Sequence, residues 1–137
     1  MTFDLGQFID RQVPLQDKYE CASIAHGGKA WPIADYTDGE RYDRTDEYLF
    51  HLVEEVIEAR SRVKRRRWKG DKEKGFLQDP QMRSEFITEL ADQLIIFASV
   101  CAYAGVSGEE LVAALEDKIG YNQVRTDHAT NDSSITS

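Results

Sequence analysis

Residues 89–101 read Glu-Leu-Ala-Asp-Gln-Leu-Ile-Ile-Phe-Ala-Ser-Val-Cys, an acidic motif followed directly by an apolar segment. The apolar residues of this stretch recur every three or four positions, which is the period of an α-helix. From Leu94 to Cys101 the helix is apolar nearly all round, so it must be covered on every side. A four-helix bundle of this size does not easily cover it alone, and we therefore expect a second subunit to complete the core.

A second acidic motif, Glu-Glu-Val-Ile-Glu, occupies residues 54–58 of an earlier amphipathic segment. Glu55 and Glu58 are three residues apart and share one face of their helix, and Glu89 and Asp92 do the same on theirs. Carboxylates on the facing sides of two packed helices repel each other unless a cation lies between them. Oxygen ligands at this density suit Mg²⁺, or Mn²⁺ in its place. The candidate metal ligands are Glu55, Glu58, Glu89 and Asp92.

This carboxylate set predicts metal-assisted hydrolysis of a phosphate-bearing substrate. Metal ions held by the four groups would bridge the phosphates and acidify a bound water. A carboxylate that does not hold the metal tightly would act as the general base, and Glu54 and Glu58 are the candidates. A single acidic pair on a helix is usually only solvated, but two pairs that each flank an apolar stripe favour a metal site. The candidate catalytic residues are Glu54, Glu55, Glu58, Glu89 and Asp92.

The first half of the chain predicts two short helices and one long helix. Residues 2–13 form an amphipathic segment that stops before Pro14, because the residue before a proline disfavours the helical conformation. Residues 15–25 predict a second short helix, closed by a pair of glycines. Residues 26–42 predict an aromatic-rich loop, and a long helix begins between residues 43 and 46, where Asp and Thr side chains serve as N-caps.

The second half of the chain carries clear helix boundaries. Asp79 followed by proline is an N-cap signal, and the helix it opens is expected to run over residues 80–104 and to stop at Gly105. Ser107 and Glu110 form a capping box that starts the last helix, which is expected to end near residue 127. Together these signals predict an all-α chain with a four-helix-bundle fold, one domain over residues 1–128 and a disordered tail over residues 129–137.

Composition restricts the classes of partner and compartment. The formal net charge of −8 argues against a general nucleic-acid-binding protein, which would show a basic surface. We expect no membrane partner, because we find no apolar run of spanning length and no signal-peptide pattern. Two isolated cysteines without motif spacing fit a reducing cytosol, so a cytoplasmic location is expected.

Basic residues offer candidate contacts to phosphate groups. Lys118, Asn122 and Arg125 follow the i, i+4, i+7 spacing of one helix face, where two cations and an amide could orient phosphates. An ordinary solvent-exposed face is the alternative for this stripe. The basic run over residues 60–69 is either a solvated helix end that suits the helix dipole, or a source of one or two further phosphate contacts.

At these residues the chain resembles the MazG-like, all-α nucleoside-triphosphate pyrophosphohydrolases. The family pattern is ExxE, a linker, then ExxD, and it is matched by residues 55–58 and 89–92. The family also carries a lysine, an asparagine and an arginine on the following helix, to which Lys118, Asn122 and Arg125 correspond. The resemblance covers residues 45–128 and rests on the ordered set of all three motifs.

The resemblance implies a helical fold completed as a homodimer or homotetramer, in the cytosol of a bacterium or of a phage-infected host. It also implies Mg²⁺-dependent cleavage of a nucleoside triphosphate between the α and β phosphates. The linker over residues 59–88 is long for the MazG proteins and is similar to that of the dimeric dUTPases. Within it, Trp68 and Lys69 resemble the Trp-Lys segment of those dUTPases. The resemblance therefore makes Trp68 and Lys69 candidate substrate-binding residues. Residues 3–12 are similar to the start of phage purine deoxynucleotide pyrophosphohydrolases. A purine deoxynucleotide, dGTP or dATP, is therefore placed ahead of dUTP.

Four other functions stay open at this point. The fold could serve a dUTP diphosphatase of the dimeric type, or an enzyme acting on phosphoribosyl-ATP or a similar metabolite. A different class is a catalytically silent helical module that binds nucleotides or a protein partner. A plain dimerisation module, finally, would have acidic residues that are only solvated and bind no Mg²⁺.

Overall fold

The computed structural model describes residues 2–68 and 79–131, with side chains for residues 2–63 and 79–125. In these ranges the chain forms four α-helices and two short 3₁₀ helices, and no strand. The all-α fold class is thus confirmed. The elements are α1 (Leu5–Ala22), η1 (Ile24–His26), η2 (Ile33–Asp35), α2 (Asp38–Trp68), α3 (Pro80–Ala104) and α4 (Gly108–Asn131).

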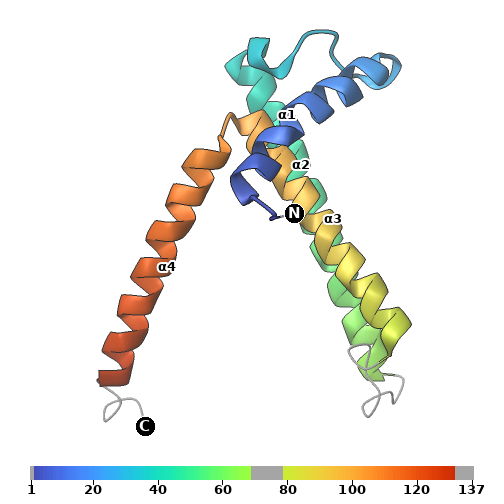
Figure 1. Cartoon of the computed structure of the whole chain (residues 1–137). Coiled ribbons are helices and arrows are strands. Elements are labelled where there is room, and N and C mark those ends of the chain that lie inside the picture. Colours follow the sequence, from blue (N-terminus) through green and yellow to red (C-terminus); the bar gives the residue numbers. More distant parts are fainter. Residues whose placement is uncertain (1, 69–78, 132–137) are drawn as a thin grey trace.

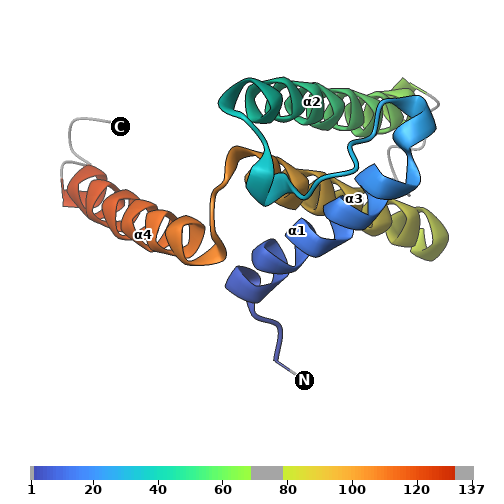
Figure 2. The ribbon, with the colours of Figure 1, turned by 90° about the horizontal axis from the view of Figure 1, so that it is seen from above.

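Helices α2 and α3 lie side by side along their length, and α1 crosses the C-terminal part of α3 (Figures 1 and 2). Helix α4 packs on α1 near its own start and then diverges from the α2–α3 pair, so that the chain resembles an inverted V in Figure 1. The described part of one chain is therefore a three-helix core with one diverging helix. The four-helix bundle completed by oligomerisation, which the sequence predicted, stays a prediction.

A close backbone contact sets the departure of α4 from α1. Gly6 and Gly108 face each other so closely that a Cβ on Gly108 would overlap the backbone of Gly6. Next to this contact, the Gly108 amide donates to Asp10 Oδ1 at 2.8 Å, so a carboxylate of α1 satisfies a free amide at the first turn of α4. Glycine at position 108 is what allows the two helices to meet here, whereas a Cβ on Gly6 would make only ordinary contact with Gly108.

Pro14 lies inside α1, and the predicted break between two short helices is wrong. A proline in a helix removes one backbone hydrogen bond and crowds the preceding turn. Packing on both sides of it offsets this cost, because Ile9 and Gln12 are buried before Pro14 and Glu20 is buried after it. Tertiary contacts thus join residues 5–22 into one helix, capped at its start by Asp4.

Helix α2 begins at Asp38, within the segment expected to be a loop. The reason is a capping box: the Glu40 amide donates to Thr37 Oγ1 at 3.1 Å, and the Thr37 amide donates to Glu40 Oε1 at 3.0 Å. The hydrogen bond from the Thr37 amide lowers the pKa of the Glu40 carboxyl, and the Lys29 ammonium beside it acts in the same direction. The N-caps expected between residues 43 and 46 therefore lie inside the helix instead.

The predicted boundaries of α3 and the start of α4 are confirmed. Asp79 Oδ1 accepts from the amides of residues 81 and 82, and Gly105 ends α3 with a positive φ of 75°. Ser107 Oγ accepts from the Glu110 amide at 3.1 Å, as the capping box required. Helix α4 continues to Asn131 and so includes the first residues of the segment assigned to a disordered tail; residues 132–137 lie outside the described ranges.

The core divides into two clusters where the helices meet. In one, Ile9 of α1 packs on Ala98 and Cys101 of α3, with the start of α4 alongside. The other consists of Ile33, Tyr36 and Tyr103 and lies where α2 begins and α3 ends. The rings of Tyr36 and Tyr103 stack with their centroids 6.1 Å apart. Burial, followed by the neighbouring Glu20 carboxylate, raises the pKa of Tyr36 to about 12.

A buried carboxylate holds this second cluster together. Glu20 is 2 % exposed and accepts from the Tyr103 hydroxyl at 2.8 Å and from the Lys29 amide at 2.9 Å. Arg44 of α2 supplies the opposite charge, with its Nε 2.8 Å from Glu20 Oε1 and its Nη2 3.0 Å from Oε2. Arg44 also donates to the Gly27 carbonyl oxygen at 2.7 Å and pairs with the exposed Glu47. Among the described side chains, Arg44 is the one cation paired with Glu20.

Large apolar side chains remain exposed along the three longer helices. Leu94, in the segment expected to need cover on every side, is 58 % exposed. Among the described helices, α3 alone has the length and the apolar composition needed to cross a membrane. Its C-terminal residues 98–103, however, are buried in the core of the chain. The exposed apolar residues of these helices include Leu49, Val53, Val56 and Ile57 of α2, Ile87, Leu90, Leu94 and Ile95 of α3, and Leu115, Ile119 and Val124 of α4.

We expect Arg44→Met to lower the free energy of unfolding by about 3–5 kcal/mol, because it leaves Glu20 buried without a counter-charge. Urea unfolding followed by circular dichroism measures the change. The matched control is Glu47→Gln, which removes an exposed partner of the same arginine and is expected to cost less than about 1 kcal/mol. Equal losses in the two variants would contradict the central place given to Glu20.

Candidate functional site

The acidic motifs of α2 and α3 line one open groove between the two helices. Its volume is about 460 Å³, and all four predicted metal ligands are among its lining residues. Glu55 and Glu58 reach it from α2, and Glu89 and Asp92 reach it from α3, so the i, i+3 spacing does place each pair on the facing side of its helix. The complete lining is Glu55, Glu58, Arg62, Ser84, Glu85, Thr88, Glu89 and Asp92.

Arg62 is the cation among these lining residues. Its Nη1 lies 3.1 Å from Glu89 Oε1 across the groove, and its Nη2 lies 3.9 Å from Glu58 Oε1 one turn earlier on α2. The guanidinium therefore stands between carboxylates of the two helices and offsets part of their repulsion. Five carboxylates against one arginine still leave the groove strongly negative.

Glu89 is the more enclosed of the two predicted metal ligands that pair with Arg62. Its side chain is 15 % exposed, and its Oε2 is buried and accepts no hydrogen bond from the described part of the chain. A buried carboxylate oxygen without a donor is costly, so this atom calls for a cation or a proton. A hard divalent ion is the partner that carboxylate oxygens suit best.

Among the described residues, no three aspartate, glutamate, histidine or cysteine side chains lie close enough together to hold one ion. The residue types and the orphaned Glu89 oxygen fit Mg²⁺, whereas the spacing of the carboxylates is wider than a bound ion requires. Arg62 lies between the two sides of the groove at that wider spacing.

Glu54 is placed away from the groove. It is exposed, and its Oε1 lies 3.5 Å from His51 Nδ1 on the outer surface of α2. Of the two candidate general bases, only Glu58 lines the groove. The helical period accounts for this difference, because Glu54 is displaced by about 100° around the helix from Glu55.

The predicted phosphate-binding stripe of α4 is separate from the groove within one chain. Lys118, Asn122 and Arg125 are all exposed, and α4 diverges from α2 and α3 (Figure 1). The Lys118 ammonium lies 5.7 Å from the centre of the Tyr121 ring, a cation–π contact within α4. The structure thus brings four of the predicted residues together and leaves this stripe elsewhere.

Two further predicted contacts cannot be placed. Trp68 is the last residue of α2, and its side chain lies outside the described ranges, as does Lys69. The sequence places Arg62 in the basic run and on the same flank of its helix as Glu55 and Glu58, without a role in the groove, and Glu85 lies outside the predicted motifs. Their spacing carried the signal: Arg62 is four residues after Glu58, and Glu85 is four residues before Glu89, so each shares a face with a predicted ligand.

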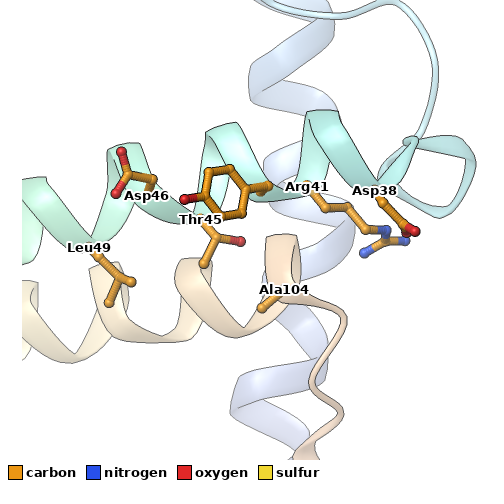
Figure 3. Close-up of a pocket in the computed structure, with 7 residues that line it drawn as sticks. Asp38, Arg41, Thr45, Asp46, Leu49 and Ala104 are labelled. Atoms are coloured by element: carbon orange, nitrogen blue, oxygen red, sulfur yellow. The ribbon is translucent and has the colours of Figure 1, made fainter.

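A second cavity, of about 360 Å³, lies on the other flank of α2. Figure 3 shows Thr45 and Leu49 of α2 and Ala104 at the end of α3 around it. Its one arginine, Arg41, donates to the carbonyl oxygens of Ile33 at 2.8 Å and Tyr103 at 3.2 Å. With its cation engaged in the fold and fewer carboxylates, this cavity offers less to a metal or a phosphate than the groove does.

Comparison with known proteins adds no assignment. The chain matches no protein-family model, no curated protein sequence and no solved structure. The resemblance to the pyrophosphohydrolases therefore remains a prediction carried by the three sequence motifs.

We expect Mg²⁺ to stabilise the wild-type protein and Glu89→Gln to remove most of that effect, because the substitution neutralises the orphaned oxygen. At about ten times its Kd the ion is expected to raise Tm by roughly 3–6 °C. The matched control is Glu54→Gln, which should keep the full Mg²⁺ effect because Glu54 lies outside the groove. A thermal shift of equal size in both variants would place the ion somewhere else.

Proposed function

We propose that the protein is a Mg²⁺-dependent nucleoside-triphosphate pyrophosphohydrolase, which converts a deoxynucleoside triphosphate and water into the monophosphate and pyrophosphate. The observation that carries the proposal is the groove itself: four carboxylates, predicted from two separate motifs, line one cavity. The orphaned Glu89 oxygen in that cavity adds support, since it calls for a cation.

Glu55, Glu58, Glu89 and Asp92 are the residues that would hold Mg²⁺. When bound, the ion would neutralise phosphate charge and acidify a water molecule for attack on the α phosphorus. Glu58 is the better candidate for the general base, because it lines the groove and is more than half exposed, so it can take a proton from a water at the groove mouth.

The negative groove needs cationic partners for the substrate phosphates. Lys118 and Arg125 would bind phosphate oxygens through charge-assisted hydrogen bonds, and Asn122 would bind a sugar or phosphate oxygen. Because α4 diverges from the groove in one chain, we place this stripe beside the groove of a second copy, or beside its own groove after α4 closes onto α2 and α3.

The exposed apolar residues support assembly as a homodimer or homotetramer. They lie on α2, α3 and α4, including the segment of α3 that should be covered on every side. A second copy that buries Leu94 and Ile119 would also bring a second α4 near the core. The base preference follows from the sequence resemblance alone, with a purine deoxynucleotide ahead of dUTP.

The direct test is a panel assay of each common NTP and dNTP with Mg²⁺, following the release of monophosphate and pyrophosphate. We expect one nucleotide to be turned over far faster than the rest.

Asp92→Asn should lower kcat by about 10²-fold or more with the helix content unchanged, because it removes a metal ligand from an exposed position. The matched control is Asp46→Asn, an exposed aspartate of α2 outside the groove.

Release of monophosphate and phosphate rather than pyrophosphate would contradict cleavage between the α and β phosphates. No release from any nucleotide, with Mg²⁺ and Mn²⁺ both tried, would favour the catalytically silent module. That second class fits one observation, since the described carboxylates are spaced too widely to hold an ion as they stand.

We expect Leu94→Glu to dissociate the assembly while leaving the chain folded. Leu94 is 58 % exposed in one chain, so the new carboxylate is solvated in a monomer and would be buried without a partner in a dimer. Sedimentation velocity measures the change in mass. Leu94→Gln, which adds no charge, should weaken assembly less, and a wild-type protein that sediments as a monomer would contradict the prediction.

A further inference from the structure

Arg62 links the two sides of the acidic groove. Its guanidinium lies 3.1 Å from Glu89 Oε1 on α3 and 3.9 Å from Glu58 Oε1 on α2. Both acceptors are among the residues that would hold the metal. One side chain therefore links the two halves of the carboxylate set.

We propose that Arg62 is an internal counter-ion that competes with Mg²⁺ for Glu58 and Glu89 and so sets the metal concentration at which the groove loads. This inference rests on the proposed function, because it takes the groove as the metal site. It adds a role for a residue that neither acidic motif contains.

The electrostatics explain why a competing cation is needed. Without Arg62 or a metal, five carboxylates would face each other across α2 and α3 with no positive side chain among the lining residues. Arginine is permanently charged, and its ion pairs with Glu89 of α3 and Glu58 of α2 offset part of the repulsion across the groove.

The same contacts show why the arginine can be displaced. Its side chain is 52 % exposed, and exposed ion pairs are weak, so leaving the groove costs little. It also satisfies Glu89 only in part, because Oε2 of that carboxylate is buried without a donor. A divalent ion carries twice the charge and takes several oxygens at once, so it neutralises the groove more completely than one guanidinium.

The decisive experiment compares Mg²⁺ binding to the wild type, Arg62→Gln and Arg62→Lys by isothermal titration calorimetry at constant ionic strength. We expect Arg62→Gln to bind Mg²⁺ roughly three- to tenfold more tightly, because the competing half-exposed ion pair is gone. Arg62→Lys, which keeps a cation, should lie between the two. In EDTA, Arg62→Gln should melt below the wild type, and Mg²⁺ should reverse this difference.

The matched control is Arg60→Gln, which removes a neighbouring exposed arginine that does not line the groove and should leave the Mg²⁺ affinity unchanged. Circular dichroism establishes that each variant is folded. Tighter binding in Arg62→Gln cannot result from damage to the fold, since damage weakens metal binding.

The outcomes separate this inference from the function on which it rests. Equal or weaker Mg²⁺ binding in Arg62→Gln, with clear binding by the wild type, would overturn the role of Arg62 and leave the metal site standing. No Mg²⁺ binding by the wild type or any variant would overturn both.

Discussion

Repulsion between like charges across the α2–α3 contact is the constraint on which the rest of this molecule depends. Carboxylates from both helices line a single groove, and the described chain offsets them with one arginine. That arrangement leaves an oxygen of Glu89 buried without a donor from the described residues, and such an atom calls for a cation, a proton or a water as its partner. The same repulsion that weakens the contact between the helices thus defines a place where a divalent cation would strengthen it.

The position of this groove follows from packing at the other end of the molecule. Arg44 and Glu20 tie α2 to α1 inside the core, and Tyr103 joins α3 to the same carboxylate. The helices are therefore fixed where residues 20, 44 and 103 meet, and from there α2 and α3 run together toward the acidic motifs (Figure 1). A buried, ion-paired core at one end of the α2–α3 pair thus contrasts with an open, charged groove farther along the two helices.

Sequence patterns were sufficient where a single helix determines the outcome. The caps at Asp79 and Ser107, the stop at Gly105 and the shared faces of the two acidic pairs depend on local periodicity and hydrogen bonding, and each was predicted. Pro14 was misjudged because contacts distant in sequence hold its helix together. The direction of α4 was also missed, since it depends on a glycine contact between residues 6 and 108 that no local pattern encodes.

The central claim is that the groove between α2 and α3 holds the catalytic metal, and one diffraction measurement tests it most directly. Crystals grown with Mn²⁺ and a triphosphate that cannot be cleaved between the α and β phosphates would give an anomalous difference map at the manganese edge. Our account predicts a peak bound by Glu89 and by carboxylates of α2, with the phosphates beside it. A peak elsewhere on the protein, or ordered triphosphate away from the groove, would contradict it.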